Sequence, residues 1–264
     1  MNKRSTVTLA VLALATLGAA APGEKPFRDL NRNGILDPYE DASLPVEQRL
    51  DDLVARMTIE EKVGELLHGT LPGHGSQIGA SLSGYDLDKA RGLMATRHVT
   101  SFITRLVLDP AQFAEQNNAI QRVAAATRLG IPVTISTDPR HHFHVTAGAS
   151  SSSGGFSQWP ETLAFAAIGD AELVRRFGDV ARREYRAVGI HMALSPQADV
   201  GSEPRWPRIT ATFGSDPATV SRLAGAYVAG FQGGTSGLTR DGVAAIVKHW
   251  VGYGAAPRGY DGHN

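Results

Sequence analysis

The chain has 264 residues, 26 of them basic and 26 acidic, so that its formal net charge is zero, and it contains no cysteine. It lacks the basic surplus of a nucleic-acid-binding protein, and the absence of cysteine excludes disulfides, thiol nucleophiles and thiolate metal sites. A hydrophobic share of 42% with 20% charged residues is typical of a globular domain that buries a core.

Residues 1–21 have the pattern of a signal peptide. Lys3 and Arg4 precede an apolar run from Val7 to Leu17, and four small residues follow at positions 18–21. The run is shorter than the roughly 20 apolar residues that a membrane-spanning helix requires. The sequence therefore predicts export to the periplasm or the extracellular space, with no membrane attachment once the signal is removed.

Residues 22–43 form an extended polar lead-in without helical or strand periodicity. Its side-chain oxygens follow the spacing of a calcium-binding EF-hand loop, with Gly34 at the turn: Asp29, Asn31, Asn33, Asp37 and Glu40. No entering helix precedes this loop, and Pro38 interrupts it, so an Asx-rich surface turn is the alternative. The pattern predicts a possible structural calcium bound by Asp29, Asn31, Asn33 and Glu40, and no required cofactor.

Helices are predicted to follow the lead-in and to open a domain over residues 44–264. After Pro45, apolar residues recur at helical spacing and form one stripe: Val46, Leu50, Leu53, Val54 and Met57. A second helix begins directly afterwards, because Thr58 and Glu61 form a capping box in which each side chain accepts a free backbone N–H.

From about residue 98 short apolar strands alternate with longer amphipathic helices, which indicates a parallel sheet. The predicted strands cover 99–103, 133–137, 190–194 and 243–247, and the predicted helices cover 110–129, 170–188 and 217–231. The glycine-rich turn of a nucleotide-binding fold is absent. A closed eight-stranded barrel needs roughly 250 residues, so the sequence predicts an incomplete (β/α)8 TIM-barrel-type domain, with about half of the barrel present.

Charged and polar side chains follow three of the predicted strands. They are Asp138, Arg140 and His141 after the second strand, Gln197, Asp199, Arg205 and Arg208 after the third, and Lys248 and His249 after the fourth. The carboxyl ends of barrel strands meet at one mouth, where such groups can bind the hydroxyls of a sugar. Salt bridges within the loops and helix caps are the structural alternative.

Several spaced motifs resemble consecutive motifs of family-3 glycoside hydrolases, in the same order. They are Ser-Thr-Asp-Pro-Arg at 136–140, Glu-Pro-Arg-Trp-Pro-Arg at 203–208, Phe-Gly-Ser-Asp-Pro at 213–217 and Lys-His-Trp-Val-Gly-Tyr-Gly at 248–254. Residues 29–34 and 56–62 are also similar to the run that precedes the barrel in secreted β-glucosidases of that family. Two positions depart from the family pattern, since Pro207 replaces a common glycine and Ala211 a common glutamate.

The resemblance implies an exo-acting, retaining glycoside hydrolase of β-glucosidase type that releases terminal β-D-glucose from oligosaccharides or glucosides. It also implies that four residues hold the hydroxyls of the terminal sugar: Asp138, Arg208, Lys248 and His249. β-Xylosides or N-acetylglucosaminides are alternative substrates within the family. The alternative from another class of protein is a non-catalytic carbohydrate-binding module.

The resemblance assigns no catalytic residue to this chain. Retaining hydrolysis needs a carboxylate nucleophile and a second carboxyl as acid and base, about 5 Å apart. In the family both follow later strands, beyond the Lys-His motif. Asp261 is too near His249 in the sequence to match the nucleophile. We therefore expect the chain to bind sugar and to be inactive alone.

Overall fold

The structure is a computed structural model that describes residues 27–73, 81–145, 150–151, 154–255 and 257–262. The predicted signal peptide lies outside these ranges. Among the described residues, no helix has the length and apolar character needed to cross a membrane.

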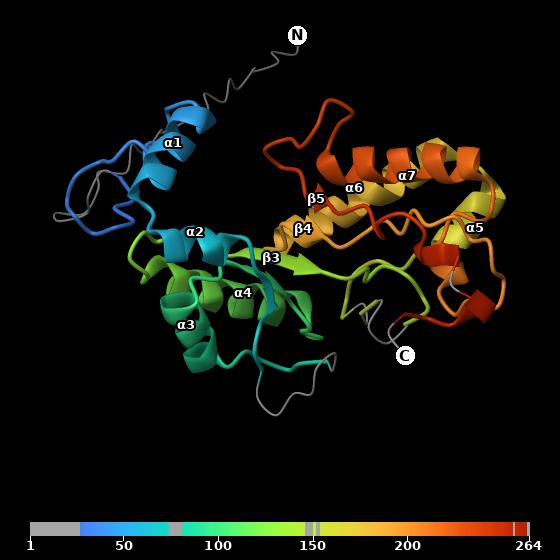
Figure 1. Ribbon diagram of the computed structural model, residues 1–264, viewed down its shortest axis with the longest axis horizontal. Coiled ribbons are helices and arrows are strands. Elements are labelled where there is room, and N and C mark those ends of the chain that lie inside the picture. The colour runs from blue at the N-terminus through green and yellow to red at the C-terminus, as the bar shows by residue number, and fades with distance from the viewer. Residues whose placement is uncertain (1–26, 74–80, 146–149, 152–153, 256, 263–264) are drawn as a thin grey trace, which may run out of the picture.

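One parallel sheet organises the chain (Figure 1). Its strands are β1 (His68–Thr70), β2 (Ser101–Ile103), β3 (Thr134–Thr137), β4 (Met192–Ala193) and β5 (Ala244–Ala245). They pair in sequence order, each parallel to the next. Because the order never reverses, right-handed crossovers place the connecting helices on one face of the sheet, as in a barrel wall. A doubly wound sheet would reverse its order, so the predicted incomplete (β/α)8-type domain is confirmed.

The prediction of four strands was wrong by one, because β1 was missed. This strand reads His-Gly-Thr and has no run of β-branched or aromatic residues that would mark it as a strand. Its Gly69 lies opposite Phe102 of β2, and a Cβ on Gly69 would approach the Phe102 ring to 3.0 Å. The close approach of Phe102 thus favours glycine at a position where glycine normally weakens a strand.

Seven α-helices occur in the described residues: α1 (Val46–Arg56), α2 (Ile59–Glu65), α3 (Leu87–Thr96), α4 (Pro110–Ala125), α5 (Thr162–Ile168), α6 (Ala171–Ala187) and α7 (Pro217–Gln232). Three short 3-10 helices also occur: Ile209–Ala211, Tyr253–Ala255 and Pro257–Gly259. The capping box of Thr58 and Glu61 is confirmed at the start of α2. The carboxylates of Asp109, Asp170 and Asp216 accept the free N–H groups at the starts of α4, α6 and α7. The short helices α3 and α5 were not predicted.

Helices α6 and α7 pack side by side next to β4 and β5 (Figure 1). They approach closely because glycines face each other: a Cβ on Gly230 would lie 2.8 Å from the Cα of Gly178 and 2.3 Å from the carbonyl oxygen of Arg175. The rings of Tyr227 and Phe231 stack beside this crossing, with their centroids 4.7 Å apart. This pair of helices therefore packs beside β5, the strand that precedes Lys248 in the chain.

The lead-in and α1 lie at the other end of the molecule (Figure 1). The lead-in is attached to the end of α4, where the hydroxyl of Tyr39 donates to the carbonyl of Leu129 at 3.2 Å. The predicted apolar stripe of α1 forms, but Val46, Leu50 and Val54 are exposed and the helix has no buried residue. Within the described residues α1 therefore contributes nothing to the core.

Candidate functional site

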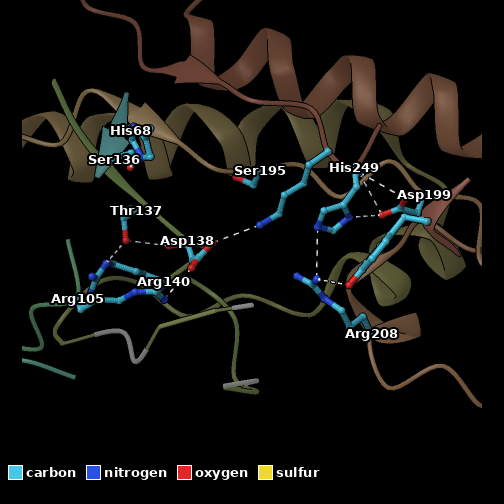
Figure 2. A network of polar contacts seen from close by, with 12 residues as sticks. His68, Arg105, Ser136, Thr137, Asp138, Arg140, Ser195, Asp199, Arg208 and His249 are labelled. Atoms are coloured by element: carbon cyan, nitrogen blue, oxygen red, sulfur yellow. Dashed lines mark hydrogen bonds and ion pairs between the residues drawn. The ribbon is translucent and has the colours of Figure 1, made fainter. Parts of the chain in front are cut away.

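Asp138 lies at the centre of a polar cluster at the carboxyl ends of the strands (Figure 2). It follows β3 directly, is buried, and accepts one hydrogen bond on each carboxylate oxygen. Oδ2 accepts from Nη1 of Arg105 at 2.9 Å, and Oδ1 accepts from Nζ of Lys248 at 3.2 Å. Arg105 follows β2 and Lys248 follows β5, so three strand ends meet at this carboxylate.

The contact with Asp138 favours the charged form of Lys248. Burial lowers the pKa of Lys248 from its usual value, the Asp138 carboxylate acts to raise it, and the nearby Arg208 and Arg105 lower it further. Without Asp138, the ammonium and the Arg105 guanidinium would face each other with no anion between them. The carboxylate is therefore the electrostatic centre of the cluster.

His249 forms a second group beside the first, and its tautomer follows from its partners. The Nδ1 of His249 lies 2.8 Å from Oδ2 of Asp199, and its Nε2 lies 3.3 Å from Nη1 of Arg208. A guanidinium nitrogen only donates, so Nε2 accepts, and the proton stays on Nδ1, where it is donated to Asp199. Burial lowers the pKa of His249, although Asp199 opposes this. The imidazole is therefore neutral at neutral pH.

Arg208 lies behind His249, with 4% of its side chain exposed. Besides His249, its Nη1 lies within 3.4 Å of the hydroxyl of Tyr253, which donates to Oδ1 of Asp261 at 2.8 Å. The Nε of Arg208 lies 3.9 Å from Oδ2 of Asp261. Arg208 therefore contacts the imidazole from the side opposite to Asp199, and Asp261 belongs to its surroundings.

All four residues predicted to bind sugar thus lie at one mouth, in two groups. Asp138 and Lys248 form one group, and His249 and Arg208 belong to the other. Lys248 and His249 are neighbours in the chain and so connect the two groups, and the peptide bond between them is cis.

Three other residues expected to present their side chains to the mouth engage protein groups instead, which corrects the expectation, although Arg140 lies beside Asp138 (Figure 2). Arg140 is buried and donates to the Thr137 hydroxyl at 2.7 Å and to the backbone carbonyl of Leu106 at 2.7 Å. His141 is buried among aromatic rings, and its Nε2 lies 2.9 Å from Oε2 of Glu184. Arg205 is exposed and pairs with Glu203. Arg140 thus holds the loop after β2, while the Glu203 carboxylate accepts both the backbone N–H and the guanidinium of Arg205 within one turn.

Two residues near the mouth were missed from the sequence. Arg105 contacts Asp138, and the available signal was its place just after a predicted strand. His68 of β1 lies between two hydroxyls, with Nδ1 at 2.8 Å from Oγ of Ser101 and Nε2 at 2.8 Å from Oγ of Ser136. Burial lowers the pKa of His68. It joins β1 to β2 and β3, and no signal marked it because β1 itself was missed.

The predicted calcium loop is a turn closed by its own hydrogen bonds; the predicted ligands are Asp29, Asn31, Asn33 and Glu40. The Glu40 carboxylate accepts backbone N–H groups from Leu30, Asn31 and Asp37. The Asp37 carboxylate accepts the side-chain amides of Asn31 and Asn33 at 2.6 and 2.7 Å. The Asp29 carboxylate accepts the N–H of Gly34 at 3.0 Å. No group of three His, Asp or Glu side chains in the described ranges is arranged to hold a metal ion.

Calcium binding by this loop stays a prediction of the sequence pattern, and the amides donated to Asp37 do not fit it as they stand. We expect the melting temperature to be the same in EDTA as in millimolar calcium, because the carboxylates of Asp37 and Glu40 already accept hydrogen bonds from protein donors. A calcium-dependent rise of several degrees that Glu40→Gln abolishes would instead establish the metal site.

Comparison with known proteins gives a consistent result. Residues 58–264 match the model of the glycosyl hydrolase family 3 N terminal domain. The chain is 59% identical over 239 residues to a periplasmic beta-glucosidase/beta-xylosidase of Dickeya chrysanthemi, an alignment that covers 90% of this chain and 36% of that protein. It is 43% identical over 266 residues to beta-glucosidase C of Emericella nidulans, which covers all of this chain and 42% of that protein.

A solved structure supports the fold. The glycoside hydrolase family 3 beta-N-acetylglucosaminidase of Paenibacillus sp. superposes with a TM-score of 0.60 at 31% sequence identity, over 78% of this chain and 35% of that one. The chain thus spans about four tenths of the length of these relatives or less. With its sequential parallel sheet and the family model matched over residues 58–264, the chain belongs to glycosyl hydrolase family 3.

Proposed function

We propose that the mouth around Asp138 is the sugar-binding site of an exo-acting, retaining β-glucosidase, and that it holds the terminal glucose of oligosaccharides or glucosides. The roles assigned are that Asp138 accepts hydroxyls, that Lys248 donates to them, and that His249, oriented by Arg208, completes the wall. The observation that carries the proposal is the buried carboxylate of Asp138 between two cations from different strands.

The chemistry of this cluster suits a sugar. Each Asp138 oxygen uses one acceptor site on a cation and retains another for a hydroxyl. A charge-assisted hydrogen bond can strengthen as the ring flattens toward an oxocarbenium-like transition state, which assists the reaction as well as binding. The full polar set supplies both donors and acceptors at one mouth, which is what a hydroxyl-rich ligand requires.

The carboxylates described near the mouth are all engaged by protein donors. Asp138 accepts from two cations, Asp199 accepts from His249, and Asp261 accepts from Tyr253. We therefore assign none of them as nucleophile or acid/base. The proposal is that the residues of this chain recognise sugar, and that hydrolysis requires the two catalytic carboxyls that members of the family carry beyond the Lys-His motif.

The 264-residue chain is expected to bind D-glucose and to release no nitrophenol from p-nitrophenyl β-glucoside. Binding is measured by ligand-observed NMR with D-mannitol, an acyclic polyol, as the control ligand. Nitrophenol release above the background of a mock purification would show that the chain carries its own catalytic carboxylates. Equal NMR binding signals from glucose and mannitol would instead contradict the proposed sugar site.

The sugar class can be separated in the same assay. The relative from Dickeya chrysanthemi carries both the β-glucosidase and the β-xylosidase name, whereas the superposed Paenibacillus structure is a β-N-acetylglucosaminidase. We propose glucose as the preferred ligand, with xylose and N-acetylglucosamine as the alternatives. We also propose export to the periplasm or beyond, in line with the signal-like residues 1–21 and the periplasmic relative.

A further inference from the structure

Arg105 lies beside Asp138 at the mouth (Figure 2) and contacts its Oδ2, whereas Lys248 contacts the other carboxylate oxygen, Oδ1. It comes two residues after β2, and 17% of its side chain is exposed. Its Nη1 donates to Asp138, while its Nε is buried and has no hydrogen-bond partner among the residues that the structure describes. A buried N–H without a partner is unfavourable for folding. The side chain is thus held at the site with one donor unsatisfied.

The two cations differ in what they can impose on the carboxylate. A lysine ammonium is a point charge on a flexible stem, whereas a guanidinium is planar and has fixed donor directions. Arg105 holds Oδ2 and Lys248 holds Oδ1, so the Asp138 carboxylate is restrained at both oxygens. The planar partner is the one that restrains its rotation.

Stability alone does not account for this arrangement. Arg105, Lys248 and Asp138 together carry one net positive charge in a largely buried place, and burying charges usually costs as much as their attraction returns. An excess of positive charge facing a cavity mouth does, however, favour the oxygen lone pairs of a hydroxylated ligand.

We propose that Arg105 is a positioning residue of the sugar site, which fixes the plane of the Asp138 carboxylate so that its two remaining acceptor sites meet neighbouring hydroxyls of one sugar ring. The inference rests on the proposed function, because it concerns how Asp138 receives the sugar. It assigns a role to a residue that follows β2, a strand after which none of the four residues predicted from the sequence lies.

The test uses three variants of the 264-residue chain: Arg105→Met, Arg105→Lys and Arg182→Met. Arg182 is the matched control, because 16% of its side chain is exposed and it pairs with Asp179 on α6. The first readout is the D-glucose Kd from NMR titration. The second is the pH dependence of Lys248 acetylation, followed by peptide mass spectrometry, which reports the Lys248 pKa without any sugar present.

Arg105→Met is expected to raise the glucose Kd about tenfold or more, the value of one charge-assisted hydrogen bond. It is also expected to raise the pKa of Lys248, because Arg105 is one of the charges that lower it, with Arg208, against Asp138. Arg105→Lys keeps the charge without the planar fork, so it should leave the Lys248 titration near that of the wild type and still weaken glucose binding. Arg182→Met should change neither readout.

Two results would overturn the inference. An unchanged glucose Kd in Arg105→Met would show that the guanidinium does not position Asp138 for sugar, and full rescue of the Kd by Arg105→Lys would show that charge alone matters. Failure of the wild type to bind glucose is a different outcome, since it overturns the proposed function and this sugar-positioning role with it. In that event the Lys248 titration still reports whether Arg105 acts on the cluster.

Discussion

Asp138→Asn is expected to weaken D-glucose binding roughly a hundredfold and to lower the free energy of unfolding by about 3–5 kcal/mol. The substitution keeps the size of the side chain but removes the negative charge between Arg105 and Lys248. The side-chain amide of the variant then directs its N–H groups toward one of the two cations. Arg105 and Lys248 also repel each other, because no negative charge remains between them. Isothermal titration with glucose and urea unfolding measure the two effects separately.

The loss of affinity must be distinguished from a general loss of stability. Glu61→Gln is the matched control, because Glu61 is also buried and paired with an arginine, Arg128, but lies on α2 away from the mouth. It should reduce stability and leave the glucose Kd unchanged. If Asp138→Asn binds glucose as the wild type does, the central carboxylate is not a sugar acceptor and the proposed site is refuted.

Asp138, Lys248 and His249 could be located from the sequence because each follows a recognisable apolar strand, and strand ends in a parallel sheet share one edge. The same rule located Arg208 less directly, through a long loop after β4. What the rule cannot give is which side of the chain each residue faces. The contact between Arg208 and His249 is a property of the folded loop alone.

Arg140 and His141 show the limit of the rule. They immediately follow Asp138, yet Arg140 donates to backbone carbonyls from the loop after β2, and His141 packs among aromatic rings. Successive side chains of an extended segment point in different directions, so adjacency to a site residue predicts little. β1 could not be predicted for a different reason. Its three residues, with a glycine at the centre, show no alternation of apolar and polar side chains.

The free energy of unfolding is expected to fall as the pH drops below about 6.5, the ordinary histidine pKa. Burial lowers the pKa of five histidines in the folded chain: His68, His141, His142, His191 and His249. Above pH 6.5 both states are neutral at these rings and stability is complete. As the pH falls toward the lower folded pKa values, only the unfolded chain takes up protons, so stability is lost by about 1.4 kcal/mol per pH unit for each such histidine.

Between pH 6.5 and 5 the five histidines set the direction of the change. Glu65 acts against them, because burial raises its pKa and the folded chain then binds a proton before the unfolded chain does. Protonation of carboxylates with lowered pKa values, such as those of Glu184 and Asp52, also lowers the free energy of unfolding as the pH falls. This effect begins only at more acidic pH. Urea unfolding at a series of pH values gives the slope. A free energy of unfolding that does not change between pH 7.5 and 5.5 would contradict the expectation.

His142→Gln tests one of the buried rings by itself. His142 is buried and its Nδ1 lies 2.8 Å from the carbonyl of Pro160. The substitution should flatten the pH slope by about one proton, because it removes a ring whose pKa burial lowers. Since a lost contact lowers stability equally at every pH, the slope isolates the proton that burial excludes from the folded ring.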